Sequence, residues 1–152
     1  MSSKTTERGM QRPRIRYAPD YVRTDGGEAG ELASAYGLSP DPWQSDLLDV
    51  WLGRNAADKF VASKAGLSVP RQNGKNGVLE MRELYGLCSI GESILHTAHE
   101  VKTARKAFIR LAGFFENERQ YPELAEMVVS IRRTNGQEAI YLNNGAQIEF
   151  SA

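Results

Sequence analysis

The sequence has little of what marks a membrane or secreted protein. Its 152 residues include one cysteine, Cys88, so an intrachain disulfide is impossible and a reducing compartment fits. No apolar run approaches the ~20 residues that a membrane-spanning helix needs. The N-terminal segment also lacks the hydrophobic core of a signal peptide. These absences predict a soluble intracellular protein.

The chain also lacks net charge, because 19 Lys and Arg residues balance 19 Asp and Glu residues. The protein therefore has no net positive charge of the kind that favours nucleic-acid binding. The charge is uneven, however, since residues 1–24 hold six basic and two acidic side chains, a net charge of +4. Residues 1–35 are otherwise polar and are predicted to form a flexible basic arm. Its arginines would contact DNA phosphates, or the arm is an ordinary disordered terminus.

Residues 36–152 are predicted to form one domain, since 41% of the sequence is hydrophobic and no internal repeat occurs. Asp41 as the N-cap and Pro42 as the first helical residue predict a helix that ends near Gly53. Its apolar stripe would hold Trp43, Leu47, Val50 and Trp51.

Alternating strands and helices follow. Loose apolar alternation over residues 60–69 predicts one or two strand segments, and residues 93–98 predict a short buried strand. Apolar residues at helical spacing predict helices over 74–88 and 100–117. Their core faces would hold Val78, Met81, Leu84, Tyr85 and Cys88 in the first, and Val101, Ala104, Phe108, Leu111 and Phe115 in the second.

Residues 126–152 predict three short strands. They are divided at Asn135-Gly136 and Asn144-Gly145, which supply the positive φ values of tight hairpin turns. The whole order predicts an α/β fold with a parallel sheet and an antiparallel β-meander at its end.

The stretch LSVPRQNGKN, Leu67 to Asn76, is close to a phosphate-binding loop. It has Gly74-Lys75, but Val69 stands where the usual pattern has glycine and Asn76 where it has Ser or Thr. Such a loop needs a strand before a tight turn, a helix whose free N–H groups face the phosphates, and a lysine. The predicted elements supply all of these. The alternative is a polar loop with a surface lysine.

The stretch VPRQNGKN, Val69 to Asn76, resembles the deviant Walker A loop of large terminase subunits, the DNA-packaging motors of tailed bacteriophages. That loop carries an arginine near its start and Gly-Lys at its end, as Arg71 and Gly74-Lys75 do here. The sequence PRQNGKN is similar to that loop in the branch of the family found in many actinobacterial phages. Three further segments agree over about residues 36–152: PWQ (42–44), ILHTAHEVKTARKAFIRL (94–111) and NNGAQIEFSA (143–152).

The resemblance implies a P-loop NTPase fold of the ASCE, RecA-like kind, with a parallel sheet flanked by helices and with ATP and Mg²⁺ as cofactors. Lys75 would bind the β- and γ-phosphates, and Arg71 would sense the γ-phosphate or stabilise the transition state, which makes these two the catalytic candidates. Gln44 would read the adenine edge, although it also fits a capping box with Asp41, and both roles stay open. The remaining nucleotide contacts would be Gln72, Asn73, Gly74 and Asn76, with Asn76 on the Mg²⁺ side.

The implied function is ATP binding in the motor that packages phage DNA into procapsids. The implied partners are double-stranded DNA, the portal protein, the small terminase subunit and further copies in a ring, all in the host cytoplasm and without a membrane. The family's Walker B strand, an apolar run that ends in Asp-Glu, and its nuclease domain are not found in this sequence. We therefore expect the N-terminal portion of an ATPase domain, with a sheet incomplete at the C-terminus, that is inactive alone. The alternatives are a helicase-like DNA-translocating P-loop ATPase and a non-enzymatic fragment that docks on motor subunits.

Other polar residues give weaker signals. His96 and His99 lack the second helical histidine of a zinc protease, so structural roles are expected. Cys88 is expected on the buried side of a helix. A basic cluster on the predicted helix 100–117 would touch DNA or a neighbouring subunit, or would simply be solvated: Lys102, Arg105, Lys106 and Arg110.

Overall fold

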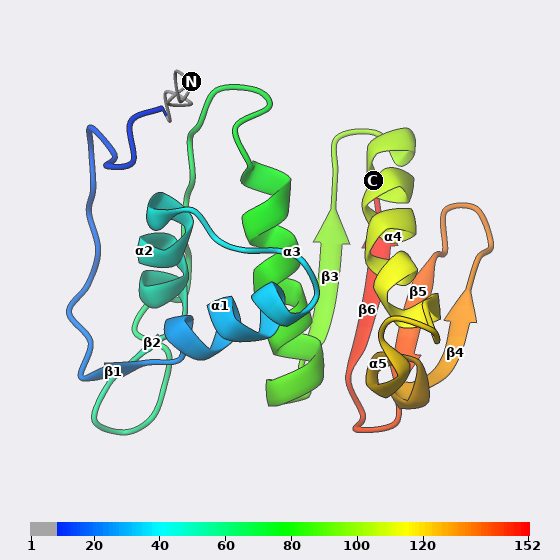
Figure 1. Cartoon of the computed structure of the whole chain (residues 1–152). Helices are drawn as coiled ribbons and strands as arrows, with labels where there is room; N and C mark the ends of the chain where they lie inside the picture. The colour runs from blue at the N-terminus through cyan, green and yellow to red at the C-terminus, as the bar shows by residue number, and fades with distance from the viewer. Residues whose placement is uncertain (1–8) are drawn as a thin grey trace, which may run out of the picture.

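A computed structural model describes residues 9–152 (Figure 1), so residues 1–8 of the predicted arm lie outside the description. The elements in chain order are β1 (Arg23–Thr24), α1 (Gly26–Ala35), α2 (Pro42–Trp51), β2 (Gly53–Arg54), α3 (Lys75–Tyr85), the π-helical turn η1 (Gly86–Ile90), β3 (Ser93–Thr97), α4 (Val101–Glu116), α5 (Pro122–Met127), β4 (Val128–Arg132), β5 (Ala139–Leu142) and β6 (Gln147–Ser151). None of the helices in this range has the length and apolar content that crossing a bilayer requires.

Helix α3 lies between the two halves of the molecule, with α1 and α2 on one side and the larger sheet on the other (Figure 1). Val78, Met81 and Tyr85 pack with Ala and Leu residues of α1 and α2. Leu84 belongs to the second core cluster, together with side chains of the sheet and α4. The helix that follows the candidate loop is therefore anchored on both sides.

The larger sheet has the strand order β3-β6-β5-β4. Strand β3 pairs with β6 in parallel, whereas β6 with β5 and β5 with β4 are antiparallel. Both predicted Asn-Gly turns are confirmed, because Gly136 has φ 77° and Gly145 has φ 87°. The α/β class and the final meander are thus confirmed, but within residues 9–152 only one strand pair, β3 with β6, is parallel.

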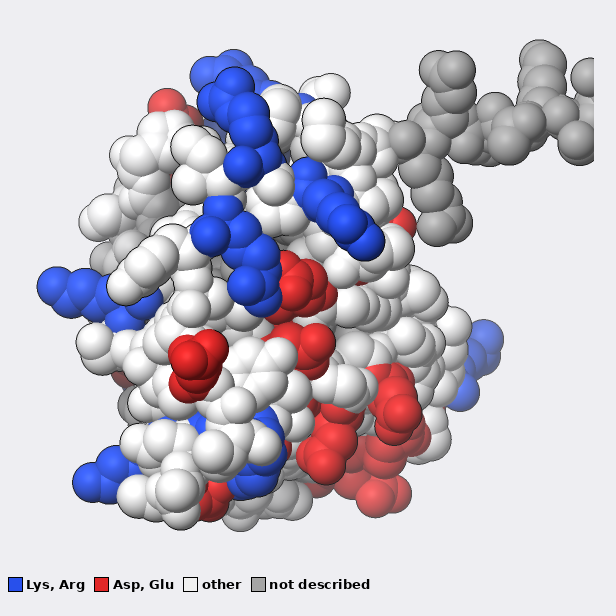
Figure 2. Space-filling model, turned by 90° about the vertical axis from the view of Figure 1, so that its left-hand side faces the viewer, with Lys and Arg blue, Asp and Glu red and all other residues white. Residues whose placement is uncertain are grey.

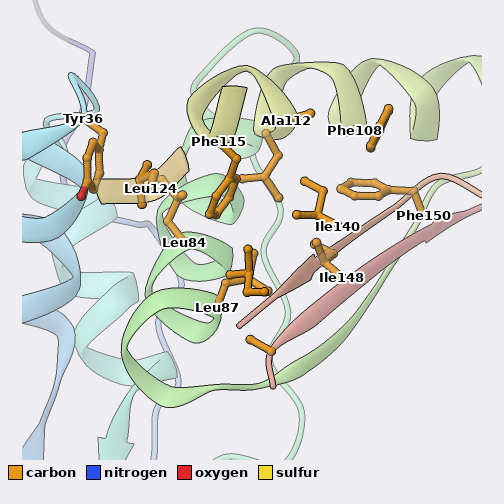
Figure 3. Close-up of a cluster of buried hydrophobic side chains, with 13 residues drawn as sticks. Tyr36, Leu84, Leu87, Phe108, Ala112, Phe115, Leu124, Ile140, Ile148 and Phe150 are labelled. Atoms are coloured by element: carbon orange, nitrogen blue, oxygen red, sulfur yellow. The ribbon is translucent and has the colours of Figure 1, made fainter. Parts of the chain in front are cut away.

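Helices α4 and α5 cover one face of this sheet (Figure 1). Phe108, Phe115 and Leu124 from these helices meet Ile148 and Phe150 of β6 in the close-up of Figure 3. The opposite face is open. Leu95 of β3 is 64% exposed, so the prediction of a buried strand at 93–98 is wrong. The reason is that β3 lies at the sheet edge with one covered face, where alternate side chains point to water.

The prediction of a flexible arm through residue 35 is wrong for residues 26–35, which form α1 and fully bury Ala29 and Ala33. Residues 26–35 are mostly Gly and Ala, so the segment shows little apolar area and no clear hydrophobic stripe in the sequence. The same small side chains allow close packing against the neighbouring helix. A Cβ added at Gly26 would lie 2.3 Å from the Asp49 Oδ1 atom of α2. Upstream of α1, Arg16 also pairs with Asp46 of α2 at 2.8 Å.

Three further predictions about elements need correction. Residues 60–69 form no strand; only an isolated bridge joins Phe60 to Arg54, because alternation alone supplies no pairing partner. Helix α5 was not expected. In α2 the fully buried residue is Leu48 rather than a member of the predicted stripe, and in α4 Val101 is 52% exposed at the first turn.

Candidate phosphate-binding site

The candidate loop makes a sharp turn directly into α3. Gly74 is the N-cap of the helix and has the left-handed φ of 84°, and Gln72 also has a positive φ of 61°. A positive φ is uncommon for a residue other than glycine. Residues 70–76 are all exposed. The predicted tight turn and the predicted helix start at Lys75 are both confirmed.

The first turn of α3 keeps backbone donors available. Gly74 has no side chain to cap the helix, and no side-chain hydrogen bond caps its start. The first intrahelical contact runs from the Val78 N–H to the Gly74 carbonyl at 3.2 Å. The N–H groups of the preceding residues have no partner in the helix, and the helix dipole adds partial positive charge there. This arrangement suits an anion.

Gln44 ties the turn to the neighbouring helix. Its Nε2 donates to the Gly74 carbonyl at 2.9 Å, and its Oε1 accepts from the Asp41 backbone N–H at 2.8 Å. The residue is 5% exposed, so both contacts are protected from water. The predicted capping box is therefore confirmed, and Gln44 has a second contact that the sequence did not indicate. Adenine recognition by Gln44 stays a prediction.

Two cations flank the turn. Arg71 and Lys75 are exposed, and neither has a carboxylate partner among residues 9–152. Asn73 donates from Nδ2 to the Arg71 carbonyl at 3.1 Å, which tightens the loop. Asn76 is exposed beside Lys75. The described range contains no group of three or more His, Cys, Asp or Glu side chains suited to a metal ion, and the Mg²⁺ role of Asn76 stays a prediction.

The loop lies at the same end of the molecule as the carboxyl ends of β3 and β6 and the start of α4, the upper end in Figure 1. Ligands of α/β sheets bind at that end of parallel strands. One expected feature is missing, because no strand leads into the loop: residues 62–70 have no regular structure. The tight turn, the helix start and the lysine are present without it.

A buried polar cluster lies further along the same helix. Glu83 of α3 contacts the Nδ1 atom of His96 at 2.5 Å, and Glu80 contacts the Nε atom of Arg110 at 2.6 Å. The two carboxylate residues are 8% and 5% exposed. The hydrogen bond with Glu83 raises the pKa of His96, and burial raises the pKa of Glu80 although Arg110 acts against it. Sequence reasoning missed both glutamates because it counted only apolar residues on the inner faces of α3.

Other predicted candidates lie outside the loop residues 70–76. His99 is exposed, and Lys102, Arg105 and Lys106 are exposed on α4. Burial raises the pKa of the Cys88 thiol to about 11, which makes a thiolate nucleophile unfavourable. A hollow of about 410 Å³ lies between α1 and α2, lined in part by Glu31 and Asp49. It contains none of the predicted nucleotide-binding residues, and an open loop that binds phosphates through backbone N–H groups does not need an enclosed cavity.

Charge is unevenly spread on the side of the molecule that carries α1 and α2. Figure 2 shows several Lys and Arg side chains toward its upper end, a group of Asp and Glu side chains from its centre to its lower right, and further Lys and Arg side chains at its lower left. Residues 25–53 contain six carboxylates and no Lys, Arg or His. An anion therefore meets less repulsion at the end that holds the loop than at the acidic surface.

In comparisons with known proteins, no family model, no curated protein and no solved structure matches this chain.

Proposed function

We propose that this chain is the ATP-binding part of a large terminase subunit, the motor that packages phage DNA. The observation that carries the proposal is the Gly74-Lys75 turn at the uncapped start of α3. It combines free backbone donors, an exposed lysine and a glycine held in a conformation that other residues disfavour. The segments that resemble terminases around this turn connect it with that family rather than with phosphate binding in general.

Each loop residue has a role that its position permits. The N–H groups at the start of α3 and the Lys75 ammonium would hold the β- and γ-phosphates. Arg71 would place a second cation against the γ-phosphate, where charge shifts during phosphoryl transfer. Gln72 and Asn73 shape the turn between them. Mg²⁺, which would neutralise phosphate charge, would find its protein oxygen at Asn76, exposed beside Lys75.

For Gln44, the contacts favour a positioning role over base recognition. Its amide oxygen already accepts from Asp41, and its amide nitrogen already donates to Gly74. An amide group has one more N–H and one more lone pair to offer. Adenine recognition would use these remaining sites, while the Gly74 contact holds the backbone that faces the phosphates.

The proposed partners follow from the resemblance: phage DNA, the portal protein, the small terminase subunit and further copies in a ring, in the host cytoplasm. Among the described surfaces, the exposed Lys102, Arg105 and Lys106 of α4 are the group best suited to DNA phosphates. They lie on the helix that starts at the same end of the molecule as the loop (Figure 1).

Calorimetric titration with Mg²⁺-ATP tests the proposal. Lys75→Ala should weaken binding by about tenfold or more, because a hydrogen bond to a charged group is worth about 1.5–3 kcal/mol. Lys106→Ala is the matched control: it removes the same charge from an exposed site on α4 and should bind like the unmodified chain. Equal losses in the two variants would indicate general electrostatic attraction and would contradict the proposal. Undetectable binding by the unmodified chain would contradict it as well.

A further inference from the structure

The cluster of Glu80, Glu83, His96 and Arg110 joins three elements. Both glutamates come from α3, His96 comes from β3 and Arg110 from α4. The Arg110 guanidinium contacts Glu80 through two nitrogens, at 2.6 Å and 3.2 Å. These contacts tie the middle of α3 to the sheet and to the helix that covers it.

The His96 ring is fixed from two sides. Its Nδ1 atom lies 2.5 Å from Glu83 Oε1, and since a carboxylate only accepts, the ring nitrogen must donate. The ring centroid lies 5.2 Å from that of Phe150 on β6. The charged groups facing the imidazole among the described residues are Glu83 and Glu80 of α3, with Arg110 of α4 paired to Glu80. The β6 side presents an aromatic ring.

Charge balance in this cluster depends on the histidine. The guanidinium compensates one buried carboxylate at every accessible pH. The other carboxylate is compensated only while the imidazole is protonated. A buried carboxylate without a compensating charge is unfavourable, and a neutral ring still donates to Glu83 but no longer supplies the opposite charge.

We infer that the Glu83–His96 pair, with the Glu80–Arg110 pair beside it, is a pH-sensitive clamp that holds α3 against β3 and α4. Because α3 begins at Lys75, the clamp also positions the backbone donors of the candidate loop. The clamp itself follows from the described contacts, whereas its effect on anion binding rests on the proposed function. His96 and Glu83 are positioning residues, since they lie within α3 and β3 and not in the loop.

The direction of the pH effect follows from the pKa of His96. The folded protein raises this pKa above its ordinary value of 6.5. The clamp therefore contributes its full stability below about pH 6.5 and loses it as the pH rises through the higher pKa of the folded state. The raised pKa of Glu80 acts in the same direction, since its proton is also bound more tightly in the folded chain.

An NMR titration of the unmodified chain tests the clamp directly. The chain has two histidines, His96 and His99. The ring signals can be assigned with His99→Gln. His96 should titrate above its ordinary pKa of 6.5, and in Glu83→Gln its midpoint should fall. A His96 midpoint at or below pH 6.5 in the unmodified chain, or one that Glu83→Gln leaves unchanged, would overturn the inference.

Urea denaturation gives a second readout. His96→Gln should be less stable than the unmodified chain at pH 5.5, and the difference should shrink at pH 8.5. His99→Gln should show no such change. A loss that is equal at both pH values would show that His96 only fills space. Should His96→Gln fail to fold, the titration of the unmodified chain still decides.

Pyrophosphate binding separates the clamp from the proposed function. The test compares the affinity of the unmodified chain with that of His96→Gln at the same pH, because the protonation of pyrophosphate affects both equally and cancels in the ratio. This ratio should be larger at pH 6 than at pH 8. Lys75→Ala should bind poorly at both. If Lys75→Ala binds normally, the proposed function fails while the NMR result stands. If the ratio is independent of pH, the link from the clamp to the loop fails while the Lys75 result stands.

Discussion

The start of helix α3 and its middle hold charged residues that differ in exposure and in pairing. At its start, Lys75 and the nearby Arg71 are exposed and have no carboxylate partner among residues 9–152. Glu80 and Glu83, one to two turns further along, are almost fully buried and paired. The two groups are neighbours in the sequence, yet only one of them is accessible to a ligand.

The difference separates two uses of charge. An exposed cation without a partner contributes little to folding, and its interactions are left for something outside the chain. A buried carboxylate is unfavourable unless it is paired, so its partners must stay in place. Exposure and a lack of partners at the start of α3 fit the proposed binding role, whereas the buried pairs in its middle hold the helix in position. Substitutions at the two sites should therefore affect different measurements.

The largest effect is expected when a buried carboxylate loses its partner. Arg110→Ala leaves Glu80 without its guanidinium and should lower the free energy of unfolding by about 1–3 kcal/mol at neutral pH, the cost of a buried charged group left unsatisfied. The lower part of that range is favoured because the Arg110 side chain is 58% exposed, and water screens part of the pair. Urea denaturation at pH 7 measures the change.

Lys106→Ala is the control on the same helix, because Lys106 is exposed and lies outside every ion pair of the described residues. Its effect should stay within about 0.5 kcal/mol. The loss in Arg110→Ala should also diminish in acid, where Glu80 takes up a proton and no longer needs a counter-charge. Equal losses in the two variants would remove the distinction between paired and unpaired cations.

A comparable effect is expected from the turn itself. Gly74→Ala forces a side chain into φ 84° and places its Cβ 2.8 Å from Gln44 Nε2. The left-handed conformation alone costs a non-glycine residue roughly 1–2 kcal/mol. We expect lower stability together with weaker binding of Mg²⁺-ATP, because the backbone donors shift with the turn.

Gly77 provides the matched control for Gly74. It lies in the first turn of α3, and a Cβ there would come no closer than 3.6 Å to Gln44 Nε2, an ordinary contact. Gly77→Ala should raise stability by about 0.5–1 kcal/mol, since alanine favours the helix. Thermal unfolding of both variants checks the opposite signs. A neutral Gly74→Ala would show that the turn tolerates a side chain and that its glycine serves no purpose here.

What the sequence predicted well is local. The capping residues of α2, the start of α3 at Lys75 and the two Asn-Gly turns each depend on a few neighbouring residues and on backbone rules that tertiary contacts rarely override. The turn geometry of the candidate site belongs to this class. For that reason, the turn and the helix start of the candidate site could be predicted without a structure.

What the sequence did not predict depends on distant partners. Alternation over residues 60–69 indicated a strand, but a strand forms only where another strand pairs with it. Glu83 and His96 are 13 residues apart, and nothing in either local pattern joins them. The hydrogen bond from Gln44 to Gly74 spans 30 residues, and no local sequence pattern predicts it. The helix cap that fixes Gln44 was predicted, because it depends on neighbouring residues.

The last prediction separates the two roles of Gln44. Gln44→Ala removes one hydrogen bond to Gly74 and one to Asp41, and should cost about 1–2 kcal/mol of stability, as for other lost caps and buried hydrogen bonds. Stability alone does not distinguish positioning from base recognition. The comparison of ligands does, because pyrophosphate has phosphates but no adenine.

If Gln44 positions the loop, Gln44→Ala should weaken binding of Mg²⁺-ATP and of pyrophosphate by the same factor. If it reads the base, only ATP binding should suffer, and the preference for ATP over GTP should fall with it. The geometry favours the first outcome, since both ends of the amide are already engaged with the backbone. A selective loss of ATP affinity would mean that the remaining N–H and lone pair of the Gln44 amide contact the base, and that the hydrogen bond to Gly74 does not determine phosphate binding.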